Sequence, residues 1–374
     1  MDTWIIPQTQ IVIVNYDKFG RAPKNKELVE GLLKRKFDMI ILDEAHKLRG
    51  IKTATTKMIQ KLHTIPHKLC LTGTPAYNRP TDIFAILRFL DASHHTSYWK
   101  WCEYWCEMEE VWTRNGVRKN PTSIKKIMRP LFVQQLSLMA VQRKRADVMP
   151  WLTDVEVIDV PIECSKIQKK YLDELELYYS VGHIKCQGTL DRLIAVRHIC
   201  NDPSIIDLKQ SSPKQEWLLE FIRDNEQKQI LVFGISKRML KKCKEFLESK
   251  LSTKYKIDII TGDVSPKKRM EIVSFFQQGY INLLLLQTQA CAAGLTLDSA
   301  DVSIFLELYP PASDYTQAKD RMVPTDVTRV KDQQIYRLFM KDTFDASLVT
   351  LVDSNVSTSD VVNSYKEYLE RRKR

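Results

Sequence analysis

The chain contains 374 residues, of which 44% are hydrophobic, 28% are charged and 11 are glycines. It is too long for one ordinary hydrophobic core, so the composition indicates a globular protein with two domains. Its formal net charge of +11 favours a polyanionic partner. No apolar run approaches the roughly 20 residues that span a bilayer, and the first residues lack the pattern of a signal peptide, so we expect no membrane partner.

Eight cysteines are spread through the chain without a C-x-x-C pair. Scattered cysteines in a chain of this size indicate reduced thiols and an intracellular protein, cytoplasmic if bacterial or viral and nuclear if eukaryotic. Cys102 and Cys106 follow His94 and His95, so a zinc site is one alternative. The surrounding sequence, Y-W-K-W-C-E-Y-W-C-E, favours an aromatic helix that packs on its own face.

The first part of the chain alternates between apolar runs and helical spacing. Residues 10–14 form a short β-rich run, and residues 26–36 have the spacing of a helix. Residues 39–42 are apolar at successive positions, which predicts a strand buried on both faces of a parallel sheet. A helix at residues 54–62 then leads to a second buried strand at residues 67–71.

Polar residues that can carry chemistry follow both of these strands. Asp43 and Glu44 follow the first strand, and Thr72, Gly73 and Thr74 follow the second. In open α/β sheets, ligands bind outside the carboxyl ends of the strands. There, Asp43 can hold a hydrated Mg²⁺ and Glu44 can orient or deprotonate an attacking water. The alternatives are an acidic helix N-terminus and an ordinary strand-to-loop turn.

Residues 93–142 depart from this alternation and are predicted to be a helical insertion, first aromatic and then basic. The basic residues contact a phosphate backbone or form a solvated helical face, and the sequence leaves both alternatives open. Residues 155–162 alternate like a strand that carries the chain between domains. We therefore expect domains at residues 1–150 and 151–355, followed by a basic tail at 356–374. The charged end of this tail contacts phosphate or is frayed, and we favour fraying. The basic part of the insertion contains Arg114, Arg118, Lys119, Lys125, Lys126 and Arg129.

The second half repeats the α/β alternation. Buried strands are predicted at residues 229–233, 281–286 and 302–306. Helices are predicted at residues 237–250 and 266–277, and the second of these carries Lys267 and Lys268.

Several motifs resemble those of one family. D-E-A-H at 43–46, followed by L-T-G-T-P-A-Y-N-R-P at 71–80, resembles motifs II and III of superfamily-two helicases, and more narrowly of Swi/Snf-like DNA-dependent ATPases. V-Q-R-K-R-A-D-V-M at 141–149 and Q-A-K-D-R at 317–321 resemble later elements of that family. G-L-T-L-x-x-A-D, followed by F-L-E-L, is closest to its annealing-helicase branch. The resemblance implies two tandem RecA-like α/β lobes, the first truncated at its N-terminus.

The resemblance also implies a function, cofactors and site residues. It implies ATP-driven movement on duplex or branched DNA, or remodelling of it, with ATP and Mg²⁺ as cofactors. Thr72, Gly73 and Thr74 would couple the nucleotide site to the nucleic-acid track, and the basic residues, including Lys267 and Lys268, would contact DNA phosphates. The implied catalytic residues are Asp43, Glu44, His46 and Arg321. Of these, Asp43 would be the Mg²⁺ ligand. The implied nucleotide-binding residues are Gly294 and Gln317.

The sequence departs from the family pattern in two places. Pro324 occupies the position of the second motif VI arginine, and Arg329 is the nearest substitute. The sequence contains no G-x-x-x-x-G-K-[ST] phosphate loop. The chain is then a motor fragment completed by a separate polypeptide, an incomplete gene product, or a non-hydrolysing DNA-binding or assembly module. An RNA helicase is a weaker alternative. An incomplete first sheet would leave an unpaired strand edge near residues 10–14.

Overall fold

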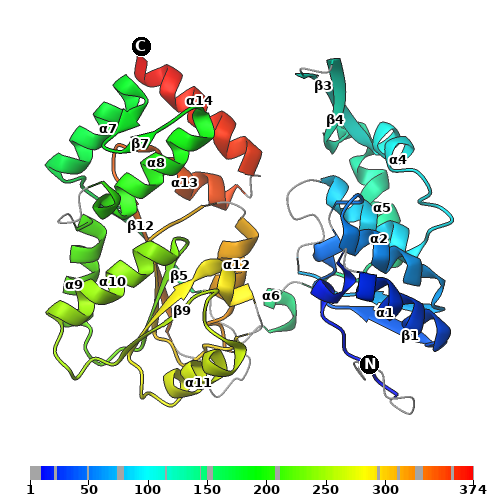
Figure 1. The fold of residues 1–374 in the computed structure, drawn as a ribbon, viewed down its shortest axis with the longest axis horizontal. Coiled ribbons are helices and arrows are strands. Elements are labelled where there is room, and N and C mark those ends of the chain that lie inside the picture. The colour runs from blue at the N-terminus through cyan, green and yellow to red at the C-terminus, as the bar shows by residue number, and fades with distance from the viewer. Residues whose placement is uncertain are drawn as a thin grey trace. The chain divides into compact units, whose positions relative to one another are not determined.

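The computed structural model describes residues 10–20, 23–48, 50–73, 80–113, 116–143, 145–149, 155–206, 211–292, 295–309, 312–324, 332–354 and 358–373 (Figure 1). The chain divides into two compact units, Met1–Gln142 and Arg143–Arg374. The domain limits predicted at residues 150 and 355 stay predictions. No described helix is both long enough and apolar enough to cross a membrane.

The first unit is built on a small parallel sheet. Strand β1 (Met39–Leu42) pairs with β2 (His67–Cys70) in a parallel register that runs from Met39 opposite His67 to Leu42 opposite Cys70. Apolar side chains of the surrounding helices, among them Val29, Ile59 and Phe89, form a core with Leu42. The helical segments near the sheet are η1 (Tyr16–Phe19), α1 (Pro23–Lys34), η2 (Ala45–Leu48), α2 (Ala54–Gln60), η3 (Lys61–Thr64), η4 (Pro80–Ile83) and α3 (Phe84–Leu90).

Three predictions for this sheet are wrong. Met39 and Ile41 are 49% and 54% exposed, so β1 buries only one of its faces. The second strand is not buried either, because β2 contains no buried residue and Leu69 is 41% exposed. Residues 10–14 lie in no strand, although Val12 and Val14 pack against the core. An apolar run shows that a segment is able to pair and be buried. It does not show that a neighbouring strand or a covering layer is present.

The predicted helical insertion is helical only in part. Helix α4 (Tyr98–Trp105) leads directly into an antiparallel hairpin of β3 (Cys106–Thr113) and β4 (Gly116–Ile124). The turn η5 (Lys126–Met128) and helix α5 (Arg129–Met139) follow. The hairpin places Glu110 opposite Lys119, a cross-strand pair of opposite charges that stabilises β pairing. The aromatic helix is confirmed, because Trp101 and Trp105 of α4 both contact the ring of Phe132.

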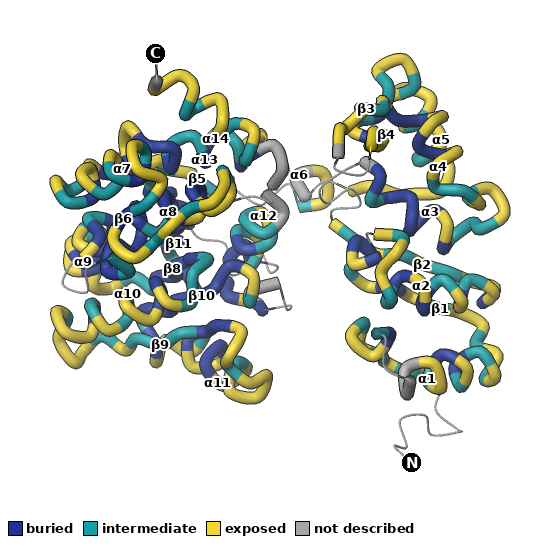
Figure 2. The backbone as a smooth tube through the Cα atoms, turned by 45° about the horizontal axis from the view of Figure 1, so that its top comes forward, coloured by how far each residue is buried: buried dark blue, intermediate teal, exposed yellow. Residues whose placement is uncertain are grey.

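The second unit carries a six-stranded parallel sheet with the order β5-β12-β11-β8-β10-β9. Every residue of β8 (Ile230–Gly234), β10 (Leu283–Gln287) and β11 (Val302–Phe305) is buried, as Figure 2 shows for the centre of this sheet. A parallel sheet covered by helices on its faces requires such continuous apolar strands. The predicted α/β fold class is therefore confirmed. The other strands of the sheet are β5 (Glu156–Ile162), β9 (Ile257–Ile260) and β12 (Gln334–Met340).

Helices of the second unit connect and cover these strands, and a two-residue ladder joins β6 (Ser180–Val181) to β7 (Ile184–Lys185). The predicted basic tail contains α14, whose Val361 and Tyr365 are buried, and the fraying expected of its charged end at residues 371–374 stays a prediction. The helical segments are α6 (Arg145–Val148), α7 (Lys166–Tyr178), α8 (Thr189–Asn201), η6 (Pro203–Ile205), α9 (Pro213–Asp224), α10 (Lys237–Lys250), α11 (Pro266–Gln277), η7 (Thr288–Ala292), α12 (Ala312–Asp320), α13 (Phe344–Asp353) and α14 (Thr358–Lys373).

A buried polar cluster fixes the helices of this unit to its sheet. The Lys214 side chain is 2% exposed, and its Nζ donates to Asp345 Oδ2 at 2.7 Å, Asn201 Oδ1 at 2.7 Å and the carbonyl of Leu306 at 2.8 Å. These partners lie on α13, on α8 and just after β11. A buried ammonium group requires such a complete set of acceptors, so this cluster holds together four parts of the unit.

Candidate functional site

The two predicted motifs of the first unit lie together at the carboxyl ends of β1 and β2. The Leu71 amide donates to the Leu42 carbonyl at 2.8 Å, and the Ala45 amide donates to the Leu71 carbonyl at 2.9 Å. These backbone bonds hold Asp43 and Glu44 beside Thr72. The proximity expected from two adjacent parallel strands is therefore present.

His46 connects the two motifs through its side chain. His46 is 8% exposed, and its Nδ1 lies 3.1 Å from Thr72 Oγ1 and 3.1 Å from Glu44 Oε2. One imidazole nitrogen is thus shared between a carboxylate and a hydroxyl. The contact therefore joins the acidic motif to the loop after β2, which is the predicted coupling loop.

Glu44 has a backbone conformation that non-glycine residues rarely adopt. Its φ is +49°, in the left-handed region, which costs about 1 kcal/mol for an L-residue. Its amide donates to Asp43 Oδ1 at 2.9 Å, a local bond that stabilises this tight turn. The turn directs the two carboxylates differently: Asp43 is exposed, whereas the Glu44 side chain is 36% exposed and reaches His46.

The donor set fits Mg²⁺ only as a partial site. Mg²⁺ keeps several waters and commonly takes one or two carboxylates together with substrate phosphates. The exposed carboxylate of Asp43 retains acceptor capacity beyond the bond from Glu44. Within the described ranges, no group of three or more His, Cys, Asp or Glu side chains gathers to hold a metal. Asp43 therefore suits a hydrated ion that shares its coordination with phosphate.

Tyr16 is a member of this site that the sequence did not identify. Its hydroxyl donates to the Asp43 carbonyl at 2.7 Å, and the Lys47 ammonium lies 5.4 Å from the centre of its ring. Burial raises the Tyr16 pKa well above its ordinary value, and nearby Cys70, Asp43 and Glu44 raise it further. Its only signal was an aromatic residue in the turn after residues 10–14, a pattern common in turns of no special role.

The remaining predicted residues of the coupling loop are only partly described. Gly73 is exposed, and a Cβ built on it would meet none of the described atoms beyond its chain neighbours within 4 Å. Packing against the described residues therefore does not require a glycine at this position. Thr74 lies outside the described residues.

In the second unit, three buried side chains tie together the loops at the carboxyl ends of the strands. The 3%-exposed Glu307 accepts the amides of Ile235 at 2.6 Å and Ser236 at 2.8 Å. Gln287 accepts the Gly262 amide at 3.0 Å and donates to the Ile235 carbonyl at 3.2 Å. The hydroxyl of Thr288 donates to the Gly234 carbonyl at 3.3 Å. Sequence reasoning did not assign these positioning roles, because nothing in a sequence shows which loop a side chain will reach.

The nucleotide-facing residues predicted in this unit lie on and just after α12. Gln317 is half-buried on α12, and the Arg321 carbonyl just beyond it accepts the Leu297 amide at 2.8 Å. This bond joins the end of α12 to the segment that precedes β11. Pro324 is buried. Gly294 and Arg329 lie outside the described residues.

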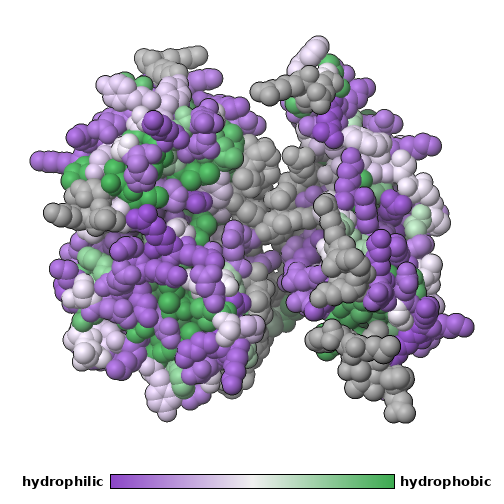
Figure 3. All heavy atoms as spheres, in the orientation of Figure 1, coloured by the Kyte–Doolittle hydropathy of each residue, from purple (hydrophilic) through white to green (hydrophobic). Residues whose placement is uncertain are grey.

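The predicted cations have different surroundings. Arg118 and Lys119 are exposed on β4, and Lys126 is exposed on η5. Lys125 Nζ donates to the Glu103 carbonyl at 2.5 Å, so this cation also holds the hairpin to α4. At the start of α11, Lys267 is exposed and Lys268 Nζ pairs with Glu271 at 3.2 Å. Polar side chains cover much of the visible surface of both units (Figure 3).

The alternative zinc site is not formed by the described residues. His94 Nδ1 lies 2.6 Å from Asp91 Oδ2, and the His95 ring packs edge-on against Phe84. Cys102 and Cys106 are buried. A hydrogen bond from Cys106 lowers the pKa of the Cys102 thiol, and the same bond raises the pKa of Cys106. The two thiols therefore interact with each other inside the fold.

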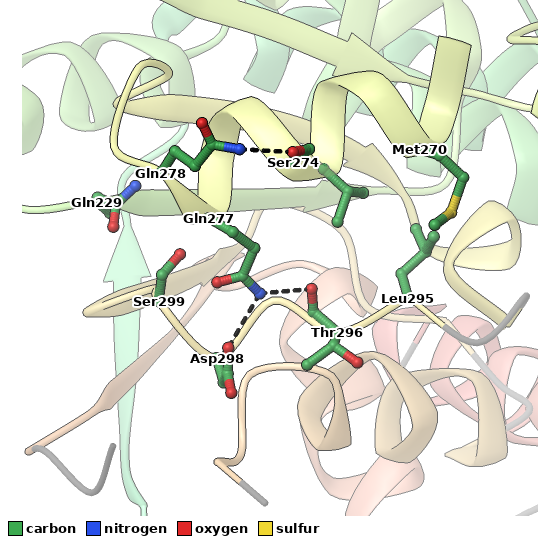
Figure 4. Close-up of a pocket in the computed structure, with 10 residues that line it drawn as sticks. Gln229, Met270, Ser274, Gln277, Gln278, Leu295, Thr296, Asp298 and Ser299 are labelled. Atoms are coloured by element: carbon green, nitrogen blue, oxygen red, sulfur yellow. Dashed lines mark hydrogen bonds between the residues drawn. The ribbon is translucent and has the colours of Figure 1, made fainter. Parts of the chain in front are cut away.

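None of the predicted site residues lines the cavity shown in Figure 4. It measures about 790 Å³ and lies between α11 and residues 295–299. The Gln277 side chain lines this cavity, and its Nε2 donates to the Thr296 carbonyl at 2.6 Å and to Asp298 Oδ1 at 3.0 Å. Gln229, which precedes β8, also lines it, so it opens at the amino ends of the strands. Its lining contains one carboxylate and no cation, which does not suit a phosphate ligand.

The fold and these motifs define a helicase-like protein of superfamily two. The sequence matches the SNF2-related domain over residues 5–205 and the helicase conserved C-terminal domain over residues 213–323. The first match covers more than half of the chain, and the chain belongs to this SNF2-related family. The predicted Swi/Snf-like membership is confirmed, whereas the annealing-helicase branch stays a prediction.

Similar proteins include large chromatin-related helicases. The chain is 24% identical over 350 residues to chromodomain-helicase-DNA-binding protein 8 of Rattus norvegicus, a match that covers 83% of this chain and 12% of that protein. It is 23% identical over 326 residues to SWI/SNF-related matrix-associated actin-dependent regulator of chromatin subfamily A-like protein 1 of Drosophila melanogaster, covering 84% and 40%. The chain thus spans about an eighth of the first protein and two fifths of the second.

Two solved structures are also similar. The Sulfolobus solfataricus SWI2/SNF2 ATPase core in complex with dsDNA is 20% identical, with a TM-score of 0.44 and coverage of 85% of this chain and 67% of that one. The C-terminal part of the Fun30 ATPase domain is 17% identical, with a TM-score of 0.47 and coverage of 58% and 97%.

Proposed function

We propose that the chain is the core of a Swi/Snf-like motor that hydrolyses ATP and translocates on duplex DNA or remodels it. The main observation that supports this proposal is the contact of His46 Nδ1 with both Glu44 and Thr72, at 3.1 Å each, in a chain of the SNF2-related family. This contact joins the acidic motif to the Thr-Gly-Thr loop. A motor requires such a link between its chemical site and the segment that responds to nucleic acid.

The residues of the first unit are assigned roles that suit their surroundings. Exposed Asp43 would hold Mg²⁺, which when bound would neutralise charge on the transferring phosphate. Glu44 would orient the attacking water, with His46 fixing the direction of its carboxylate. Tyr16 would support the Asp43 backbone through its 2.7 Å hydrogen bond.

In the second unit, Gly294, Gln317 and Arg321 are assigned to the nucleotide. A guanidinium aimed at the γ-phosphate would stabilise charge that develops during hydrolysis. The sequence contains no G-x-x-x-x-G-K-[ST] loop, whose backbone amides and lysine would bind the phosphates. The proposal places the complete protein inside the cell.

DNA is the polyanion proposed to balance the net charge of +11. Exposed Arg118, Lys119, Lys126 and Lys267 are assigned to phosphates, whereas Lys125 and Lys268 already have partners within their own units. The name of the rat relative, which includes both helicase and DNA-binding, supports this assignment. Contacts to phosphates would position the protein without reading the base sequence.

The test is phosphate release from ATP and Mg²⁺ by the full chain, measured while duplex DNA is titrated. The motor proposal expects release that rises with DNA and saturates as the DNA sites fill. Duplex RNA, added at the same phosphate concentration, separates a DNA-directed motor from an RNA helicase.

A non-hydrolysing DNA-binding or assembly module is the alternative function. Buried Pro324, at the position where the family has an arginine, favours it because a proline offers no cation to the nucleotide. Salt-sensitive DNA binding without phosphate release would support this module and contradict the motor proposal.

A further inference from the structure

The outer half of the hairpin formed by β3 and β4 projects from the rest of the first unit (Figure 1). The base of the hairpin is fixed, because Cys106 and Ile124 lie opposite each other and both are buried. Each residue at 109–112 and 116–119 is exposed, and none of them belongs to a hydrophobic core of the described residues. The side chains of this outer half therefore face solvent or a ligand, and not the interior of the fold.

The outer half carries an open tryptophan ring. Tryptophan is highly buried on average, and Trp101 and Trp105 of α4 are 7% and 6% exposed. Trp112, by contrast, is 82% exposed, and Val117 directly opposite it is 47% exposed. The hairpin thus presents most of an indole surface to the outside.

The same face of the hairpin carries a cation. The register places Trp112 opposite Val117 and Glu110 opposite Lys119. Directly opposite residues of an antiparallel pair share a face, and the face alternates along each strand, so these four side chains lie on one face. Trp112 and Lys119 occupy diagonal positions, which are about 7–8 Å apart. One ligand can therefore contact the indole ring and the ammonium group together.

Two interactions within the hairpin compete with such a ligand, and both are weak. An aromatic side chain opposite a β-branched one stabilises β pairing, but Trp112 stays 82% exposed beside Val117. Glu110 and Lys119 are both exposed, and an exposed pair of opposite charges contributes little. Neither interaction therefore closes this face to a ligand.

We propose that this face binds an unpaired nucleotide of DNA, with the base stacked on Trp112 and a phosphate paired with Lys119. The inference rests on the proposed function, in which DNA is the partner. Aromatic rings beside cations suit single-stranded nucleic acid, because every base has a π-face and every nucleotide has a phosphate. In a duplex the bases stack on one another, so a base must be unpaired to stack on the indole. The net charge of +11 favours this partner over an apolar protein surface, which would offer no anion to Lys119.

The test compares a blunt duplex with the same duplex carrying an unpaired oligothymidine tail. The affinity of the full chain for each DNA is measured by fluorescence anisotropy without ATP. The parent chain is expected to bind the tailed duplex about 5- to 150-fold more tightly, which is the range for one base stacked on an aromatic side chain.

Substitutions at position 112 separate stacking from packing. Trp112→Leu keeps an apolar side chain opposite Val117 but has no π-face, whereas Trp112→Phe keeps an aromatic ring. Trp112→Leu should abolish the preference for the tailed duplex, and Trp112→Phe should retain part of it. The matched control is Trp99→Leu, because Trp99 is 42% exposed but lies on α4, and this variant should bind both DNAs like the parent chain. Lys119→Gln should reduce the slope of log K against log salt on the tailed duplex by about 0.7.

Three results would overturn the inference. The first is equal affinity of the parent chain for the two DNAs, and the second is a preference for the tail that persists in Trp112→Leu. The third is a loss of affinity in Trp112→Leu that is the same for both DNAs, which would assign Trp112 to the structure of the hairpin.

Duplex-stimulated phosphate release is a separate readout. If it is present while the tail has no effect on affinity, the inference fails and the motor proposal stands. If the chain binds neither DNA, the proposed DNA partner fails together with the inference.

Discussion

Replacement of Lys214 by methionine tests whether the buried polar cluster holds the second unit together. Lys214→Met keeps the length of the side chain but removes an ammonium group that has three acceptors within 2.8 Å. Asp345 would stay 4% exposed, with the Met340 amide as a hydrogen-bond donor at 2.8 Å. Removing one partner of a buried ion pair costs about 3–5 kcal/mol, because the other charge is left without compensation.

The assay is thermal and denaturant unfolding of Lys214→Met beside a matched variant, Lys237→Met. Lys237 also pairs with an aspartate, Asp263 at 2.5 Å, but these side chains are 42% and 58% exposed. An exposed pair contributes only about 0–1 kcal/mol. At about 2–4 °C per kcal/mol, Lys214→Met should lower the Tm of the second unit by roughly 6–20 °C.

Equal destabilisation by the two variants would refute this reasoning. A double variant, Lys214→Met with Asp345→Leu, adds a second check. Because it removes both buried charges, it should recover part of the stability lost in the single variant. If the double variant is no more stable than Lys214→Met, the unpaired Asp345 carboxylate is not the cause of the lost stability.

Two further predictions concern pH and salt. Hydrogen bonds from Ser93 and His94 lower the pKa of Asp91 to about 2, so its stabilising effect is present above pH 3.8 and is lost as the pH falls through 2. Ser93→Ala should move the Asp91 midpoint upward, toward 3.8, in an NMR titration, and an unchanged midpoint would contradict the assigned bond. For DNA binding, Lys267→Ala should reduce the slope of log K against log salt by about 0.9, whereas Lys366→Ala on α14 should leave it unchanged. Equal slopes for the two variants would remove Lys267 from the DNA contact.

The sequence predicted the second unit more fully than the first. Strands β8, β10 and β11 are continuously apolar and lie at the centre of a covered sheet, so local pattern and tertiary burial agree. The run at Met39–Leu42 has the same pattern, but its exposed face depends on neighbours that the pattern does not specify. The sequence did not predict the hairpin of β3 and β4. The helical spacing of the aromatic residues before Cys106 was taken to continue through the rest of the insertion.

The candidate site was predicted by residue type and order but not in its geometry. Asp43, Glu44 and Thr72 were expected together because each follows a parallel strand. The left-handed backbone of Glu44 and the position of Tyr16 depend on how the turn packs. Glu307 was likewise not assigned, because its partners lie about 70 residues earlier in the chain.

DNA-stimulated phosphate release by Glu44→Gln tests the central claim most directly. The substitution removes the carboxylate charge with little change in volume, and the matched variant Glu367→Gln alters an exposed carboxylate on α14. We expect DNA to stimulate phosphate release in the parent chain and in Glu367→Gln, whereas Glu44→Gln should bind DNA equally well with release abolished. Release that persists in Glu44→Gln at the parent rate would contradict the central claim.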